Sequence, residues 1–229
     1  MTKKPLSAIG IVMPDDFPTA LYESIHSRLT PITVSAPEAT YDQYKGAWNA
    51  LSYRFLSCEE HNKAFIKSIK RAGNSPPSSE RYIQEKELFN FFVNGLSVIE
   101  SLFYGLFAIA SMIDSANFPI KTKKDMRAIT PEETARKFEK LFPMESISDV
   151  LKKVNGSKKF IEWKTIRNIL AHRSSPRRSF YAGGPENGQA QWIHNISIDK
   201  DTTALRYKWL IKTITDIMRE ADIFTQTHF

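Results

Sequence analysis

The sequence predicts an all-α protein, a helical bundle of five to six helices with a small β-leaning insertion before the last helix. Apolar residues recur at steps of three and four through 37–71 and 201–224, which is the spacing of one face of an α-helix. Between them, 88–113 is a run of 26 residues with a single charge, Glu100. A helix that is apolar on all sides is typically buried, so these patterns favour a bundle around one central helix.

Proline, glycine and serine clusters divide the chain into helical segments. The stretch GNSPPSS at 73–79 ends one long helix and supplies an N-cap for the next. Thr-Pro-Glu-Glu at 130–133 has the residues of an N-cap, a first helical position and an acidic first turn. Residues 174–199 look irregular, although RSFYAGG and QAQWIHNISI could pair as a hairpin. Helices are expected over 13–29, 37–71, 80–114, 131–142, 146–154, 157–172 and 201–224.

The apolar segment 80–114 is long enough to cross a membrane. Asn90, Asn94 and Glu100 lie inside it, and a carboxylate is costly in lipid, so a central bundle helix is the better interpretation and no membrane contact is expected. The small residues at 97, 101 and 105 repeat every four positions. Such a stripe lets another helix approach closely, from within the chain or from a second subunit.

Length and composition indicate one soluble domain. The 229 residues suit a single domain over 1–229, with an N-terminal helical part at 1–79, a core at 80–229 and an insertion at about 174–199. Cys58 is the only cysteine, so no intrachain disulfide forms and a reducing, cytoplasmic location is expected. Prolines interrupt the N-terminal apolar run, so it does not resemble a signal peptide.

Positive charge is concentrated in one segment. The formal net charge is +7, and 158–178 carries seven basic residues and one acid, which is 7 − 1 = +6. A concentrated basic segment favours phosphate-bearing partners, while a solvated face is an equally good interpretation of charge alone. The candidates for RNA binding are Lys164, Arg173, Arg177 and Arg178.

The helix at 157–172 combines a predicted buried face with three polar residues near its end. The buried face is expected to consist of Phe160, Trp163, Ile166, Ile169 and Leu170. The polar residues are Arg167, Asn168 and His172. Asn168 and His172 are four apart and share a face, whereas Arg167 lies about 140° from His172 around an ideal helix.

Arg167-Asn168 followed by three residues and His172 resembles the R-N-x-x-x-H motif of HEPN domains. These domains are small helical bundles, frequently dimeric, and many are metal-independent ribonucleases of toxin–antitoxin, phage-defence and RNA-processing systems. The resemblance covers about 80–224 in architecture, with motif-level similarity only at RNILAH. It implies Arg167, Asn168 and His172 as catalytic residues, with Glu100 supporting the site from an earlier helix.

The resemblance also implies how cleavage would proceed. RNA supplies its own nucleophile, the 2′-OH, and His172 would transfer a proton at neutral pH. Arg167 would stabilise charge on the phosphate. The family implies a homodimer, RNA as substrate, an antitoxin or nucleotidyltransferase partner, and no metal or other cofactor.

Two alternatives stay open. The same fold could be a non-catalytic module that binds RNA, a nucleotide or a protein through its basic groove, or a purely structural dimeric bundle. A second match to the spacing exists at Arg54 and His61, but it lacks the asparagine and lies mid-helix, so we interpret it as chance. Cys58 and His61 lack the further ligands that a zinc site needs. The aromatic residues near the basic loop could stack on bases or anchor the insertion: Phe180, Tyr181 and Trp192.

Overall fold

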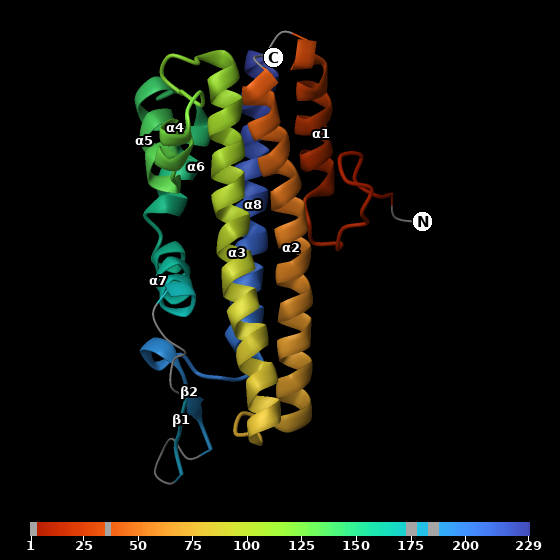
Figure 1. Ribbon diagram of the computed structural model, residues 1–229, viewed down its shortest axis with the longest axis vertical. Helices are drawn as coiled ribbons and strands as arrows, with labels where there is room; N and C mark the ends of the chain where they lie inside the picture. Colours follow the sequence, from red (N-terminus) through yellow and green to blue (C-terminus); the bar gives the residue numbers. More distant parts are fainter. Residues whose placement is uncertain (1–3, 35–37, 173–177, 183–187) are drawn as a thin grey trace. The chain divides into compact units, whose positions relative to one another are not determined.

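The structure is a computed structural model that describes residues 4–34, 38–172, 178–182 and 188–229. Within these ranges the chain is mostly helical, with eight α-helices and one two-stranded sheet (Figure 1). The all-α class is confirmed. The helices are α1 (Thr19–Leu29), α2 (Glu38–Ala72), α3 (Ser78–Ile113), α4 (Lys123–Ala128), α5 (Pro131–Leu141), α6 (Ser146–Asn155), α7 (Lys158–His172) and α8 (Asp201–His228).

Local signals set most helix ends. Thr130 caps α5 by accepting a hydrogen bond from the Glu133 amide at 3.1 Å, with Pro131 in the first turn. Gly73 ends α2 with φ +69°, a left-handed conformation that glycine adopts without strain. The expected helices omitted residues 123–128, which form the short helix α4. A capping box between Thr122 and Asp125 starts this short helix.

Two further boundaries differ from those expected. Helix α1 begins at Thr19, five residues after Pro14 and directly after Pro18, rather than at residue 13. The insertion forms less sheet than a full hairpin, since β1 (Ser179–Phe180) and β2 (Ala190–Gln191) have two residues each and pair antiparallel. Short 3-10 turns lie at Thr30–Val34 and Ile193–Asn195.

The chain forms two compact units that do not follow chain order. Unit 1 comprises Met1–Tyr53, Ser97–Phe160 and Ile211–Phe229, and unit 2 comprises Arg54–Leu96 and Ile161–Leu210. Helices α2, α3, α7 and α8 each contribute residues to both units. In unit 2, α2 and α3 run antiparallel and join at 73–77 (Figure 1).

The core of unit 1 is rich in aromatic contacts. Tyr22 stacks on Trp48 with ring centroids 5.2 Å apart. Gly105 of α3 faces this pair, because a Cβ at Gly105 would lie 3.4 Å from the Trp48 ring and 3.6 Å from Ala47. One member of the predicted small-residue stripe therefore serves close packing within the chain. A second group of contacting aromatic rings in unit 1 consists of Phe107, Phe118, Phe138, Phe142 and Phe224.

In unit 2, a fully buried tryptophan occupies a notch in α3. Trp163 contacts Phe91 and Phe92 at ring-centroid distances of 5.1 and 5.4 Å. Opposite the indole, α3 carries Gly95, where a Cβ would lie 1.9 Å from Trp163 Cζ3 and 3.1 Å from Cys58 Sγ. Atoms cannot approach so closely, so only glycine fits at this position.

Burial of α3 supports its predicted role as a core helix. An 18-residue window of α3 has a mean hydropathy of 1.8, which is apolar and long enough to cross a membrane. Within the protein, 72% of that window is buried. This burial is typical of a helix in the core of a protein.

Gly95→Ala is expected to lower the free energy of unfolding by about 1–3 kcal/mol or more, because the new methyl overlaps Trp163. Gly46→Ala is the matched control. Gly46 lies within α2, and a Cβ there would meet nothing within 4 Å, so this change should raise stability by about 0.5–1 kcal/mol. Urea denaturation of both variants measures the difference, and equal effects would contradict the notch.

Candidate functional site

Helix α7 carries the predicted motif and is anchored by its buried face. Phe160, Trp163 and Ile166 are buried as expected, and Ile169 and Leu170 are half-buried. The indole of Trp163 also contacts Trp209 of α8 with ring centroids 6.1 Å apart. The residues 161–172 are therefore held within unit 2 by packing on one side of the helix.

An ion pair adds a polar anchor on α7. Arg206 Nη2 of α8 donates to Glu162 Oε1 at 2.5 Å, and Arg206 Nη1 donates to the Thr202 carbonyl at 2.7 Å. The guanidinium also lies over the Phe92 ring, 5.8 Å from its centroid. Charge-assisted bonds and a cation–π contact together fix Arg206 against α7.

The structure places Arg167 and Asn168 half-buried near the end of α7, and His172 is the last residue of that helix. These three predicted residues lie in the same unit. Glu100 is half-buried on α3 but belongs to unit 1, so the structure does not bring it into the unit that holds the motif. Its supporting role stays a prediction.

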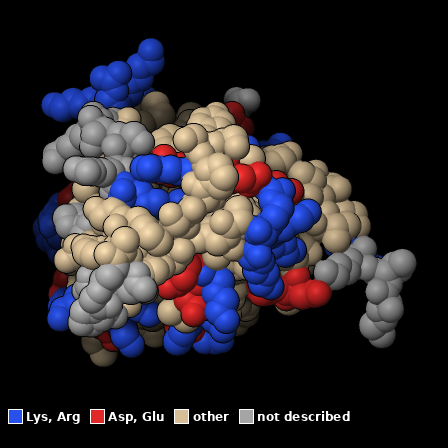
Figure 2. All heavy atoms as spheres, turned by 90° about the horizontal axis from the view of Figure 1, so that it is seen from below, with Lys and Arg blue, Asp and Glu red and all other residues tan. Residues whose placement is uncertain are grey.

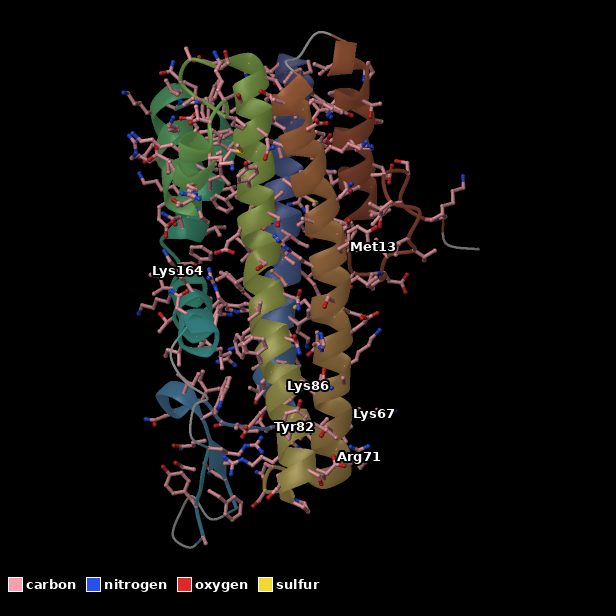
Figure 3. All side chains as sticks on the ribbon, viewed as in Figure 1. Met13, Lys67, Arg71, Tyr82, Lys86 and Lys164 are labelled. Carbon is pink, nitrogen blue, oxygen red and sulfur yellow. The ribbon has the colours of Figure 1, made fainter. Side chains whose placement is uncertain are left out.

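The predicted RNA-binding residues have different fates. Lys164 is exposed on α7 (Figure 3), whereas Arg173 and Arg177 lie outside the described residues. Arg178 is only 8% exposed, although we expected it on an open basic loop. The expected location was wrong, because the side chain of Arg178 turns inward from the start of β1 and Nη2 donates to Gln84 Oε1 at 2.9 Å.

Burial shapes the chemistry of Arg178. It lowers the pKa of the guanidinium to about 10, an effect that Glu85 partly opposes and Arg81 reinforces. Among the residues that the structure describes, no acceptor lies within hydrogen-bond distance of its Nε and Nη1. Gln84 is fully buried and bridges two segments, since its Nε2 also donates to the Gly73 carbonyl at 2.9 Å. Arg178 therefore holds the insertion against α3 rather than presenting charge to solvent.

Acidic side chains interrupt the basic surface. Figure 2 shows Lys and Arg in several separate groups on the face seen from below, with Asp and Glu between them. Sequence spacing alone placed most of the excess charge in one patch. Because Arg178 is buried and Arg167 is half-buried, the described part of 158–178 presents fewer exposed cations than the sequence suggested.

His61, from the second match to the motif spacing, forms an ion pair in unit 2. His61 Nδ1 lies 2.5 Å from Glu87 Oε2, and Lys86 Nζ lies 3.0 Å from Glu87 Oε1. Burial raises the pKa of the Glu87 carboxyl, but hydrogen bonds from His61 and Lys86 outweigh it, and the pKa lies below its ordinary value. His61 thus joins α2 to α3. Sequence spacing could not reveal this partner.

Cys58 is not arranged as a nucleophile. Burial raises the pKa of its thiol well above the ordinary value, and Sγ faces the Phe91 carbonyl at 3.7 Å. A reactive cysteine needs a stabilised thiolate. Across the described ranges, no group of three or more His, Cys, Asp or Glu side chains could hold a metal ion.

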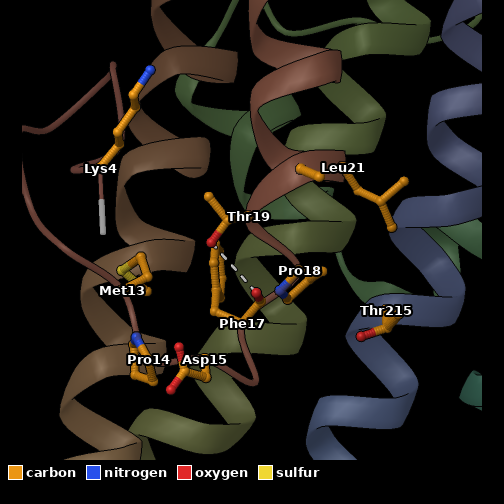
Figure 4. Close-up of a pocket in the computed structure, with 10 residues that line it drawn as sticks. Lys4, Met13, Pro14, Asp15, Phe17, Pro18, Thr19, Leu21 and Thr215 are labelled. Atoms are coloured by element: carbon orange, nitrogen blue, oxygen red, sulfur yellow. Dashed lines mark hydrogen bonds between the residues drawn. The ribbon is translucent and has the colours of Figure 1, made fainter. Parts of the chain in front are cut away.

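A cavity of about 510 Å³ lies in unit 1 beside the start of α1 (Figure 4). Its walls are mainly apolar, with Met13, Phe17 and Leu21, and Thr19 Oγ1 donates to the Phe17 carbonyl at 3.4 Å. Lys4 and Asp15 add opposite charges to the lining. None of the residues predicted for the site is among the described residues that line it.

Comparisons of the chain with known protein families, with curated proteins and with solved structures find no match. The likeness of Arg167, Asn168 and His172 to a HEPN motif therefore remains a prediction. What the geometry adds is their setting on an anchored helix in one compact unit.

Gln84→Ala should lower the free energy of unfolding by about 1–3 kcal/mol, because it leaves the buried Arg178 guanidinium without its bond to Oε1 and also removes the bond from Nε2 to the Gly73 carbonyl. Asn90→Ala is the control, since this amide of α3 donates an exposed bond to the Lys86 carbonyl, and the change should alter stability by less than about 0.5 kcal/mol. Chemical denaturation compares them. Similar values for both would show that Gln84 is not a support.

Acid should weaken the link between α2 and α3. Because the folded pKa of Glu87 is below its ordinary value of 4.5, the carboxylate stabilises the fold above that pH. This stabilisation is lost as pH falls through the folded pKa. In urea denaturation at a series of pH values, the free energy of unfolding of Glu87→Gln should fall less steeply with acid than that of the wild type. Parallel curves would contradict the assignment.

Proposed function

We propose that the chain is a HEPN-like, metal-independent endoribonuclease of the toxin or phage-defence type, with its site at the C-terminal end of α7. The observation that carries the proposal is the placement of Arg167 and Asn168, half-buried within five residues of the helix end at His172. Such side chains are restrained in direction and still reachable by a ligand. Packing of Trp163 restrains the helix itself, as a catalytic constellation requires.

Each residue has a distinct task in this proposal. His172 takes the proton of the RNA 2′-OH, or gives one to the departing 5′-oxygen. The 2′-oxygen bonds to phosphorus as the bond to the 5′-oxygen breaks, which leaves a 2′,3′-cyclic phosphate and a 5′-hydroxyl. Arg167 donates to the phosphate oxygens where negative charge increases. Asn168 shares a face with His172 through the four-residue spacing and orients the substrate.

One imidazole cannot remove one proton and donate another at the same moment. Two copies of the chain with their α7 helices face to face would supply both groups, so we include a homodimer in the proposal. Exposed Lys164, with Arg173 and Arg177, would contact RNA phosphates. Buried Arg178 is left out of that set. A toxin role implies a silencing partner, either an antitoxin or a nucleotidyltransferase.

Purified protein is expected to cleave single-stranded RNA in EDTA and to leave 2′,3′-cyclic phosphate ends. His172→Ala removes the proton-transfer group, so the rate should fall by about 10²–10⁴. Arg167→Ala removes charge stabilisation and should slow cleavage by about 10²–10³. Denaturing gels of labelled RNA give the rates, and mass spectrometry of the products identifies the ends.

His61→Ala is the control for this experiment, because Arg54 and His61 repeat the spacing but His61 pairs with Glu87. It should cleave at the wild-type rate, with its fold checked by circular dichroism. Equal rates for the wild type and His172→Ala would reject the proposed nuclease. Loss of cleavage in His61→Ala alone would assign the activity to α2 instead of α7.

A further inference from the structure

One end of the α2–α3 hairpin in unit 2 combines exposed cations with an exposed aromatic ring. Lys67 and Arg71 on α2 are exposed and four residues apart, and so are Tyr82 and Lys86 on α3. Residues four apart share a helix face. Figure 3 shows all four side chains at the same end of the α2–α3 hairpin. We call this set the hairpin surface: Lys67, Arg71, Tyr82 and Lys86.

Ion pairs hold the two helices in register along the hairpin surface. Arg71 pairs with Glu80 next to the turn, and His61 pairs with Glu87 farther along. Because α2 and α3 are antiparallel, these pairs bring the basic positions of α2 level with the aromatic and basic positions of α3. The four residues therefore lie at similar heights along the hairpin, within the span of a short single-stranded ligand.

Arg71 and Lys86 keep donors for a ligand although each pairs with an acid. The Lys86 side chain is 47% exposed and the Glu87 side chain 8%, and Arg71 is likewise more exposed than Glu80. The carboxylates thus lie beneath the cations and orient them. An ammonium has three N–H donors and a guanidinium five, so each pair leaves donors toward solvent.

Tyr82 is the feature that points to a particular ligand. The residue is 68% exposed, but single exposed aromatic residues are common, so exposure alone does not identify a binding site. Here, however, Lys86 lies one helical turn from Tyr82 on α3, and the exposed Lys67 and Arg71 of α2 lie at the same end of the hairpin. Phe89, seven residues on and therefore on the same side of α3, is also exposed. Exposed rings beside Lys and Arg are what proteins use to stack unpaired bases while contacting phosphates.

We propose that the hairpin surface binds single-stranded RNA, with an unpaired base stacked on Tyr82 and adjacent phosphates held by Lys67, Arg71 and Lys86. The choice of RNA rests on the proposed function, whereas the surface is defined without the α7 motif. The bases of a duplex are paired and stacked on one another, so a duplex offers no unpaired base that could stack on Tyr82. An acidic protein would use the cations but offers no unpaired base.

The test titrates the full chain into fluorescein-labelled 2′-O-methyl RNA of about 12 nucleotides and follows anisotropy. This RNA lacks the 2′-OH nucleophile, so binding is measured whether or not the chain cleaves RNA. Tyr82→Ala should weaken binding at least about fivefold, and Tyr82→Phe should retain it. Gln at all three cations should reduce the slope of log K against log salt by about 2.

Matched controls lie elsewhere on the chain. Tyr53→Ala removes an exposed tyrosine that lies on α2, in unit 1. Gln at Lys121, Lys123 and Lys153 removes three exposed lysines of unit 1. Both controls should bind as the wild type does, and thermal unfolding checks that every variant is folded.

Unchanged affinity of Tyr82→Ala, or equal losses in the controls, would overturn the hairpin surface. The hairpin surface would also be overturned if the cation changes weakened the binding of single-stranded RNA, an RNA duplex and polyglutamate equally while Tyr82→Ala had no effect. That result would identify a surface for an acidic protein. Normal binding together with no cleavage of ordinary RNA would leave the hairpin surface standing and reject the proposed nuclease alone.

Discussion

The fit of Trp163 against Gly95 is the constraint on which the candidate site depends. Any side chain at Gly95 would overlap the indole, so the absence of a Cβ lets α7 approach α3 closely. A helix fixed at one large side chain has its other directions defined, because each residue turns by about 100°. Arg167, four residues after Trp163, is therefore restrained by a contact more than seventy residues away in sequence.

Buried polar groups form a second layer of constraint in unit 2. Gln84 joins Arg178 to the Gly73 carbonyl, and the buried Gln84 amide and Arg178 guanidinium would be costly to leave without a partner. Lys86 and Arg178 differ in their exposure to solvent. Lys86 lies over a buried carboxylate and stays accessible, whereas Arg178 turns inward. Charge counted along the sequence consequently overstates the charge that α7 and Arg178, the described part of 158–178, present to solvent.

Periodicity and punctuation predicted the long helices closely, because repeated apolar spacing and strong caps act locally. Short elements needed finer signals, as the capping box at Thr122 and Asp125 shows for α4. Gln84 stands four residues before Leu88 on the buried stripe of α3, and that spacing could have indicated a buried amide. The inward turn of Arg178 and the pair of His61 with Glu87 depend on residues distant in sequence, which no local pattern encodes.

The single cysteine provides a chemical probe of how often the core of unit 2 opens. Cys58 is fully buried beside the Gly95 notch, and its thiol is kept protonated by burial. Because Cys58 is fully buried, a thiol reagent can reach it only after α2, α3 and α7 separate. Burial also suppresses the thiolate, which is the reactive form. If Cys58 reacts more slowly than a free thiol, its labelling rate measures how often this core opens. The same rate then reports the motion that would release α7.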